Sequence, residues 1–232
     1  MALLLNIDTA TEYAGICISK GTQVLGVEES MDQKNHGAFV QPAIQNLLLK
    51  LNININAIDG IVVSAGPGSY TGLRVGLSTA KGLCYTLQKP LIMVNTLKVM
   101  AYAAMLETRG KKHENGDLLF CPMIDARRME VFTALFNDRL DYIIAPTALV
   151  LTEISADFFP KDRSIVLSGN GSIKLQAINT LEQAIYINGT HGAQHLAYLG
   201  LKAFEKQQFA DLAYCEPFYV KEFFSPQPAM KN

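Results

Sequence analysis

Hydrophobic and polar positions along the first half of the chain alternate between short strand-like runs and longer segments with helical spacing. The strand-like runs, each bounded by turn-forming residues, lie at 2–7, 13–19, 22–28, 60–64 and 90–95. Helical spacing covers 36–51, 70–88 and 96–107, and Pro42 requires the first of these helices either to start late or to kink. The order β-β-β-α-β-α-β-α predicts a mixed sheet with helices on its faces.

The second half of the chain repeats this order loosely, as a second, related lobe would. Strands are expected at 118–124, 129–136, 142–145, 165–168 and 184–187, and helices at 152–158, 172–178 and 192–207. Residues 109–116 form the only sharp break in composition and predict a linker between a first lobe, 1–108, and a second, 117–223. Residues 224–232 contain two prolines and a polar end, so a mobile tail is expected there.

A glycine-rich turn links the strand at 60–64 to the helix at 70–88. Gly66 and Gly68 permit tight or positive-φ backbone, and Ser69 or Thr71 can cap the helix and leave N–H groups free for an anion. The spacing matches neither the P-loop nor the dinucleotide fingerprint, and an ordinary strand-to-helix turn explains the residues as well. The candidate nucleotide or anion contacts are Asp8, Thr9, Gly66, Gly68, Ser69 and Arg74.

The helix after this turn carries small side chains at every fourth position: Gly72, Gly76, Ala80 and Cys84. Because glycine inside a helix costs about 1 kcal/mol relative to alanine, this face predicts a close approach of other backbone. That backbone belongs either to the protein's own sheet or to another subunit. The wide apolar face of the helix at 36–51 favours the second interpretation.

Composition narrows the class of protein. Hydrophobic residues make up 49% of the chain and charged residues 18%, which argues against disorder, and the net charge of −1 gives no bulk signal for nucleic acid. No apolar run reaches the roughly 20 residues that span a bilayer, and the N-terminus lacks the basic region of a signal peptide. The four scattered cysteines are typical of reduced thiols, so a cytoplasmic protein is predicted.

No constellation of catalytic groups emerges. His191 and His195 have the i, i+4 spacing of metal ligands, but a third ligand is missing and His191 reads as a solvated histidine at a helix start. The charged run from Asp125 to Glu130 is more typical of a salt-bridged hairpin than of an acid–base pair, and Asp8–Thr11 is typical of an Asx turn. We therefore expect no catalytic residue and no metal site.

Four motifs together resemble the bacterial TsaB family, also called YeaZ. They are Asn6-Ile-Asp-Thr-Ala-Thr11, His36 followed by Pro42-Ala-Ile44, Gly66-Pro-Gly-Ser-Tyr-Thr-Gly-Leu-Arg-Val-Gly76 and Asp125-Ala-Arg-Arg128. The resemblance extends to about Phe223 and is most specific over the first 100 residues. It implies an α/β, actin-like ATPase (ASKHA) fold of two ribonuclease-H-like lobes with mixed sheets, in which helix 192–207 can pack back on the first lobe.

The resemblance also implies a role in making threonylcarbamoyladenosine at position 37 of tRNA. In that pathway the transferase is the paralogous subunit TsaD, and TsaE is its ATPase partner. TsaD carries a His-x-x-x-His metal motif, and Thr96 and Met100 occupy the matching positions here. The family's contact with TsaD, or with a second TsaB, uses the first two helices. The residues implied at that contact are Phe39, Ala43, Leu47, Gly72, Leu73, Gly76 and Ala80.

A non-catalytic scaffold subunit for TsaD is therefore the predicted function, with a homodimer when alone and with TsaE and tRNA engaged through the complex. No cofactor of its own is expected, and ATP or ADP only at the interface of the complex. After Asp8 there is no glycine until Gly15, which disfavours independent ATP hydrolysis. The alternatives are an ATP-binding phosphotransferase of the actin-like superfamily and a metallopeptidase-like hydrolase.

Overall fold

Two five-stranded mixed sheets form the framework of the molecule. The computed structural model describes residues 1–32, 35–110, 117–152, 158–178, 181, 184–189 and 191–221. The expected linker at 109–116, the expected helix at 152–158 and the expected tail at 224–232 lie largely or wholly outside the described residues. No helix in the described part of the chain is long and apolar enough to cross a membrane.

The first sheet has the strand order β3-β2-β1-β4-β5. Its strands are β1 (Leu3–Asp8), β2 (Ala14–Lys20), β3 (Gln23–Ser30), β4 (Gly60–Ser64) and β5 (Leu91–Val94). β1 to β3 are antiparallel neighbours, whereas β4 and β5 run parallel to β1. All residues of β4 are buried, because a parallel strand covered on both faces needs a continuous apolar run.

The second sheet repeats the same topology in the order β10-β9-β6-β7-β8. Its strands are β6 (Leu119–Asp125), β7 (Glu130–Phe136), β8 (Tyr142–Val150), β9 (Ile165–Ser168) and β10 (Ala184–Tyr186). β8 continues to Val150, five residues beyond the expected end at 145, because its pairing with β7 persists to the pair Glu130–Val150. The α/β fold of two related mixed-sheet lobes predicted from the sequence is confirmed.

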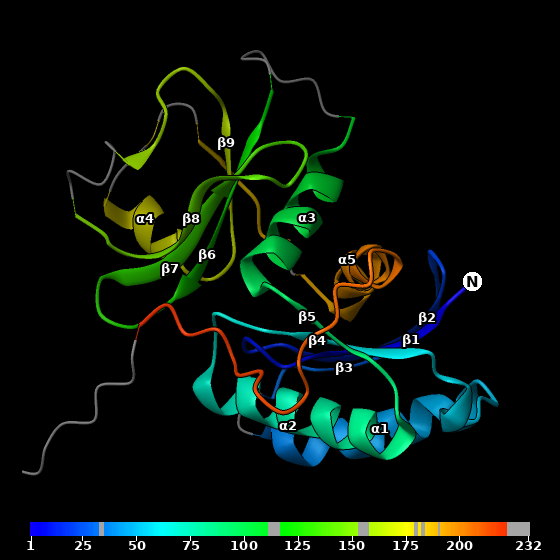
Figure 1. The fold of residues 1–232 in the computed structure, drawn as a ribbon. Coiled ribbons are helices and arrows are strands. Elements are labelled where there is room, and N and C mark those ends of the chain that lie inside the picture. Colours follow the sequence, from blue (N-terminus) through cyan, green and yellow to red (C-terminus); the bar gives the residue numbers. More distant parts are fainter. Residues whose placement is uncertain are drawn as a thin grey trace, which may run out of the picture.

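Helices cover the sheets in layers (Figure 1). α1 (His36–Lys50) and α2 (Tyr70–Leu87) lie side by side on one face of the first sheet. α3 (Thr96–Thr108) and α5 (Ala193–Glu205) lie between the two sheets, and α4 (Ser172–Ile178) packs on the second sheet. A short 3₁₀ helix at Ile55–Ala57 follows α1. α1 begins at His36 with Pro42 inside it, which excludes the late start, one of the two expected alternatives.

The two central helices are exchanged between the lobes. α3 follows the last strand of the first sheet but packs on β6, β7 and β9, whereas α5 follows the second sheet but packs on β1, β2, β4 and β5. The approach of α5 is close: a β-carbon at Gly200 would stand 2.6 Å from Val62, and one at Gly60 would stand 3.0 Å from Phe204. One apolar core therefore joins both sheets through these helices.

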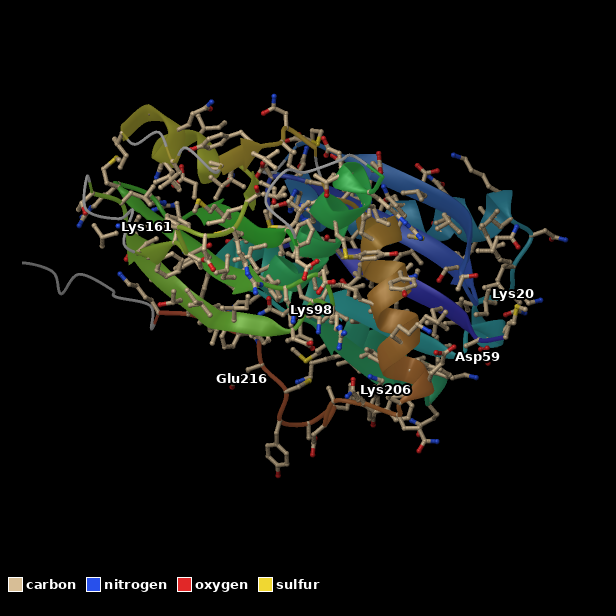
Figure 2. The ribbon with its side chains drawn as sticks, turned by 90° about the horizontal axis from the view of Figure 1, so that it is seen from above. Lys20, Asp59, Lys98, Lys161, Lys206 and Glu216 are labelled. Carbon is tan, nitrogen blue, oxygen red and sulfur yellow. The ribbon has the colours of Figure 1, made fainter. Side chains whose placement is uncertain are left out.

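Residues 206–221, here called the C-terminal strap, leave α5 and run along α2 toward the second lobe (Figure 1). In the view from above, Lys206 marks the end of α5 and Glu216 lies farther along the strap (Figure 2). The amides of Ala210 and Phe218 donate to the carbonyls of Leu91 (2.8 Å) and Ala65 (2.7 Å). Lys221 then forms an ion pair with Glu130 of β7. The strap thus ties the first sheet to the second.

Candidate functional site

The glycine-rich turn before α2 is filled by the protein's own backbone. A β-carbon at Gly68 would stand 2.0 Å from the carbonyl oxygen of Ala10, and one at Gly66 (φ +109°) would stand 2.4 Å from that of Phe218. The amide of Ser69 donates to Ala10 (2.6 Å), and its hydroxyl caps the helix by accepting from the amide of Gly72 (3.3 Å). The protein's own backbone thus packs closely against Gly66 and Gly68, and the anion contact at Gly66, Gly68 and Ser69 stays a prediction.

Asp8 and Thr9 are also enclosed, since neither has exposed surface. The Oδ1 atom of Asp8 accepts from the amide of Ala10 (3.2 Å) as an Asx turn would, and the Thr9 hydroxyl donates to the carbonyl of Gly72 (2.7 Å). Arg74 is exposed, stacks over the Tyr70 ring at 4.1 Å and donates from Nε to the hydroxyl of Tyr219 (3.2 Å). These six candidate contacts do not converge on one anion site.

The small face of α2 meets the first sheet rather than another subunit. A β-carbon at Gly72 would stand 2.1 Å from the carbonyl oxygen of Thr9, and one at Gly76 would stand 2.4 Å from Thr9 Oγ1. Ala80 has no exposed surface, and three further residues expected at the subunit contact (Ala43, Leu47 and Leu73) are also buried. These six residues are buried within the chain and Phe39 is half-buried, while the subunit contact itself stays a prediction.

The opposite side of the two helices is open. We call it the outer helical face; its exposed residues are Gly37, Ala38, Gln41, Pro42, Gln45, Asn46 and Leu49 of α1, and Thr71, Arg74, Ser78 and Gly82 of α2. Leu49 is 72% exposed. A groove of about 400 Å³ lies between the helices, lined among others by Gln41, Gln45 and Leu83. Between His36 and Lys50, α1 has no charged side chain.

A cleft of about 280 Å³ lies between the two lobes and is lined by residues from both. Tyr13 forms part of it: the Tyr13 hydroxyl donates to Glu29 (3.0 Å) and accepts from the amide of Ala193 (3.2 Å). Burial raises the pKa of Tyr13 well above its usual range. The His191 Nε2 atom lies 3.5 Å from Oδ2 of Asp8, and both side chains are buried. His191 is therefore not the solvated histidine that its helix-start position suggested.

His195 has a structural role at the start of α5. Its Nδ1 atom accepts from the amide of Gly192 (2.9 Å), which fixes the first turn of the helix. Burial and the neighbouring His191 lower the pKa of His195. Among the described residues there is no group of three His, Cys, Asp or Glu side chains that could hold a metal ion.

Charged side chains surround the mouth of the cleft. Asn170 donates to Glu12 (2.9 Å) and thereby links the lobes, while Lys174 pairs with Asp125 (2.6 Å). Partial burial opposes ionisation of Asp125, but Lys174 and the Arg127 amide outweigh it and lower its pKa. In the expected salt-bridged hairpin at 125–130, Asp125 forms its ion pair with Lys174 and Glu130 with Lys221, and both lysines come from other segments.

Sequence reasoning missed the cleft and the strap. Tyr13, Ser168 and Asn170 were not candidates, because nothing local marks a residue whose partners lie more than 150 positions away, as for Asn170 and Glu12. The available signal was the run Ser168-Gly-Asn-Gly-Ser172 after a buried strand, in which Gly169 has a φ of +84°.

Comparisons with known proteins agree with the fold described above. A family model described as "TsaD: tRNA N6-adenosine threonylcarbamoyltransferase" matches residues 18–222. The tRNA threonylcarbamoyladenosine biosynthesis protein TsaB of Bacillus subtilis is 30% identical over 228 residues, covering 94% of this chain and 93% of that protein. The protein of the same name in Escherichia coli is 32% identical over 135 residues, which cover 58% of this chain and 54% of that one.

The structural comparison supports the fold over the whole molecule. The solved structure of YeaZ from Pseudomonas aeruginosa superposes with a TM-score of 0.78 at 22% identity, covering 94% of this chain and all of that one. At this identity the similarity establishes the shared fold, and the sequence match to the Bacillus subtilis protein establishes the family.

Proposed function

The chain belongs to the TsaB (YeaZ) family, and from this premise we propose that it is a non-catalytic subunit that binds and stabilises TsaD. In this role it serves threonylcarbamoyl transfer to adenosine 37 of tRNA. It engages TsaE and tRNA through the complex, and it forms a homodimer when alone. Its compartment is the cytoplasm, which is consistent with four free thiols at Cys17, Cys84, Cys121 and Cys215.

The outer helical face is the observation that carries the proposal. Two adjacent helices present a groove and exposed apolar atoms, and α1 offers no charged side chain between its ends. Depletion of charge is the compositional mark of the core of a protein interface, because a charge buried without a partner costs free energy. The contact therefore uses the exposed positions of α1 and α2, such as Gln45, Leu49 and Ser78, rather than the buried small face.

The residues at the positions of the TsaD metal motif serve structure in this chain. The Thr96 hydroxyl accepts from the amide of Gly66 (3.0 Å), and the Thr96 amide donates to the Gly66 carbonyl (2.9 Å). Met100 lies in the core between the sheets and is only 5% exposed. Neither side chain offers the nitrogen of a histidine ligand, which argues against the metallopeptidase alternative.

A phosphotransferase is disfavoured by the filled turn at Gly66–Ser69 and by the enclosure of Asp8 and Thr9. We expect no cofactor held by this chain alone at that turn. ATP or ADP at the interface of the complex would instead meet Arg74, which is exposed at the N-terminal end of α2 beside a shallow hollow of about 320 Å³.

The test is light scattering coupled to size exclusion, on the protein alone and mixed with TsaD of the same organism. Leu49→Glu places a charge on the outer helical face and is expected to abolish both the homodimer and the mixed complex. Ile173→Glu on α4, where the native side chain is 65% exposed, is the matched control and leaves both intact. Unchanged assembly of the Leu49→Glu variant would refute this surface as the interface.

A further inference from the structure

The outer helical face carries one charged side chain, Arg74 of α2. Between His36 and Lys50, α1 has no charged residue, and the other cation of α2, Lys81, donates to carbonyls of the strap. Arg74 is therefore the only charge among the exposed residues of this face, and none of them is acidic. A single charge on an otherwise neutral contact surface points to an opposite charge on the partner, because burying it unpaired costs free energy.

Two tyrosines hold the guanidinium of Arg74 in one orientation. It stacks over the Tyr70 ring, with its central carbon 4.1 Å from the ring centre, and its Nε atom donates to the Tyr219 hydroxyl (3.2 Å). The centres of the Tyr70 and Tyr219 rings lie 5.4 Å apart. No hydrogen bond from either terminal nitrogen of Arg74 is found among the described residues. These nitrogens form a planar fork that suits a carboxylate, and the fork is oriented before a partner arrives.

Arg74 lies where the two helices meet, so a partner that covers both helices covers it as well. A β-carbon at Gly37, near the start of α1, would stand 4.0 Å from Val75, the residue that follows Arg74. No described residue that lines the hollow beside Arg74 is acidic. The outer helical face thus offers Arg74 no counter-charge, and the counter-charge has to come from the partner.

A second copy of this chain does not supply that counter-charge from the same face. In a two-fold symmetric pair each copy presents the same residues, so two outer helical faces bring together two copies of Arg74 and no carboxylate. Glu216 of the strap is exposed but lies outside this face, and no ion pair joins it to Arg74 in the described part of the chain. A different subunit can place an aspartate or a glutamate opposite Arg74.

We propose that Arg74 selects the partner of the outer helical face: it forms an ion pair with a carboxylate of TsaD and weakens the homodimer, in which it stays unpaired. The inference rests on the proposed function, since it assigns a selective contact to the same face. Selectivity of this kind combines an attraction to the right partner with a cost for the wrong one. The homodimer then forms when the chain is alone and gives way once TsaD is present.

The test compares the native chain with Arg74→Met, which keeps an aliphatic stem and removes the charge. Sedimentation velocity over a dilution series measures the homodimer, and titration calorimetry with TsaD of the same organism measures the mixed complex, both without nucleotide. The variant is expected to bind TsaD at least about tenfold more weakly. Its homodimer is expected to be as tight as the native one or tighter, because the unpaired charge is gone.

Salt separates the charge of Arg74 from the packing of its side chain. Raising the salt concentration from about 0.05 to about 0.5 M should weaken the native mixed complex several-fold, because screening reduces the attraction, and should not weaken the homodimer. The mixed complex of Arg74→Met should lose this salt dependence. Tyr219→Phe removes the hydrogen bond that orients Arg74 and keeps the charge, so it should weaken the mixed complex less than Arg74→Met and retain the salt dependence.

Arg139→Met makes the same substitution at an exposed arginine between β7 and β8, and this matched control should leave both affinities unchanged. Circular dichroism confirms that each variant is folded before it is titrated. Equal weakening of the homodimer and the mixed complex by Arg74→Met, or no effect on either, would overturn the proposal. So would an effect on the mixed complex that appears only when ATP or ADP is added, because the anion at Arg74 would then be a phosphate.

A failure of the proposed function gives a different pattern. If Leu49→Glu abolishes assembly while Arg74→Met binds TsaD like the native chain, the outer helical face is the interface and only the role of Arg74 is refuted. If Leu49→Glu assembles normally, or the native chain does not bind TsaD, the proposed function is refuted and this inference with it.

Discussion

Gly72 lies directly against Thr9, so that a β-carbon on residue 72 would stand 2.1 Å from the Thr9 carbonyl oxygen. The obstructing atom belongs to backbone in the fully buried turn after β1, which cannot move aside without disturbing the sheet. Gly72→Ala is therefore expected to lower the free energy of unfolding by about 3 kcal/mol. Urea denaturation followed by circular dichroism measures the loss.

Gly82 supplies the control on the same helix, since a β-carbon there would meet nothing within 4 Å. Gly82→Ala is expected to raise the free energy of unfolding by about 0.5–1 kcal/mol, because alanine restricts the unfolded chain and favours the helix. Equal effects of the two substitutions would show that α2 does not pack on β1 as described.

Stability should depend on pH through His195. Burial and the neighbouring His191 lower the pKa of His195 in the folded protein. Below the usual histidine pKa of about 6.5, the unfolded chain therefore binds a proton at His195 more readily than the folded chain does. This contribution to stability is complete above about pH 6.5 and is lost as pH falls toward the lowered pKa. Urea midpoints of the native protein should decline from about pH 7 to pH 5.

His195→Asn isolates that contribution, because the asparagine side-chain oxygen can accept from the Gly192 amide as Nδ1 does. The variant should have a smaller decline in stability over the same pH range. Parallel curves for the variant and the native protein would remove His195 as the cause.

Thiol labelling should separate Cys215 from the other three cysteines. Cys17, Cys84 and Cys121 are buried, and burial raises their pKa values to about 12, so each thiol is protonated near neutral pH. In native buffer a thiol reagent should modify Cys215 first, and in urea it should modify all four. Rapid labelling that persists in Cys215→Ser would contradict the burial of the others.

Lys81 should control how firmly the C-terminal strap is held. Its Nζ atom donates to the carbonyls of Ala213 (3.4 Å) and Cys215 (3.1 Å). Lys81→Met removes both bonds and keeps the aliphatic stem, so Cys215 should be labelled several-fold faster. Lys50→Met, which deletes a surface cation from α1, should leave the rate unchanged, and equal rates in both variants would deny Lys81 this role.

Periodicity predicted the elements of this fold well, because each depends on a local pattern. The strands at 60–64 and 165–168 were located to the residue, since a short apolar run between turn residues leaves little choice. The partner of a helix is not a local property. Nothing in Ala193–Glu205 tells that its apolar side covers the first sheet, because any apolar sheet would satisfy the same pattern.

The candidate site was predicted less well, for a similar reason. Small residues at Gly72, Gly76 and Ala80 do predict a close approach, and that approach exists, but the spacing carries no information on whether the neighbour is the same chain. Arg74, a candidate anion contact, is exposed near the N-terminus of α2, whereas its contact with Tyr219 of the strap has no local signal in the sequence. The neighbours of the small face of α2 and of Arg74 are both distant in sequence, so a local pattern cannot identify them.

The exchange of α3 and α5 also governs when the protein can fold. All strands of the first sheet have been synthesised by Val94, yet in the described part of the chain one of its faces packs against Ala193–Glu205. During translation that apolar face, including Leu4, Val62 and Ile92, must wait for nearly the entire chain to leave the ribosome. The second sheet and its covering helices α3 and α4 are all synthesised before α5, so the lobe that is translated second can mature before the first.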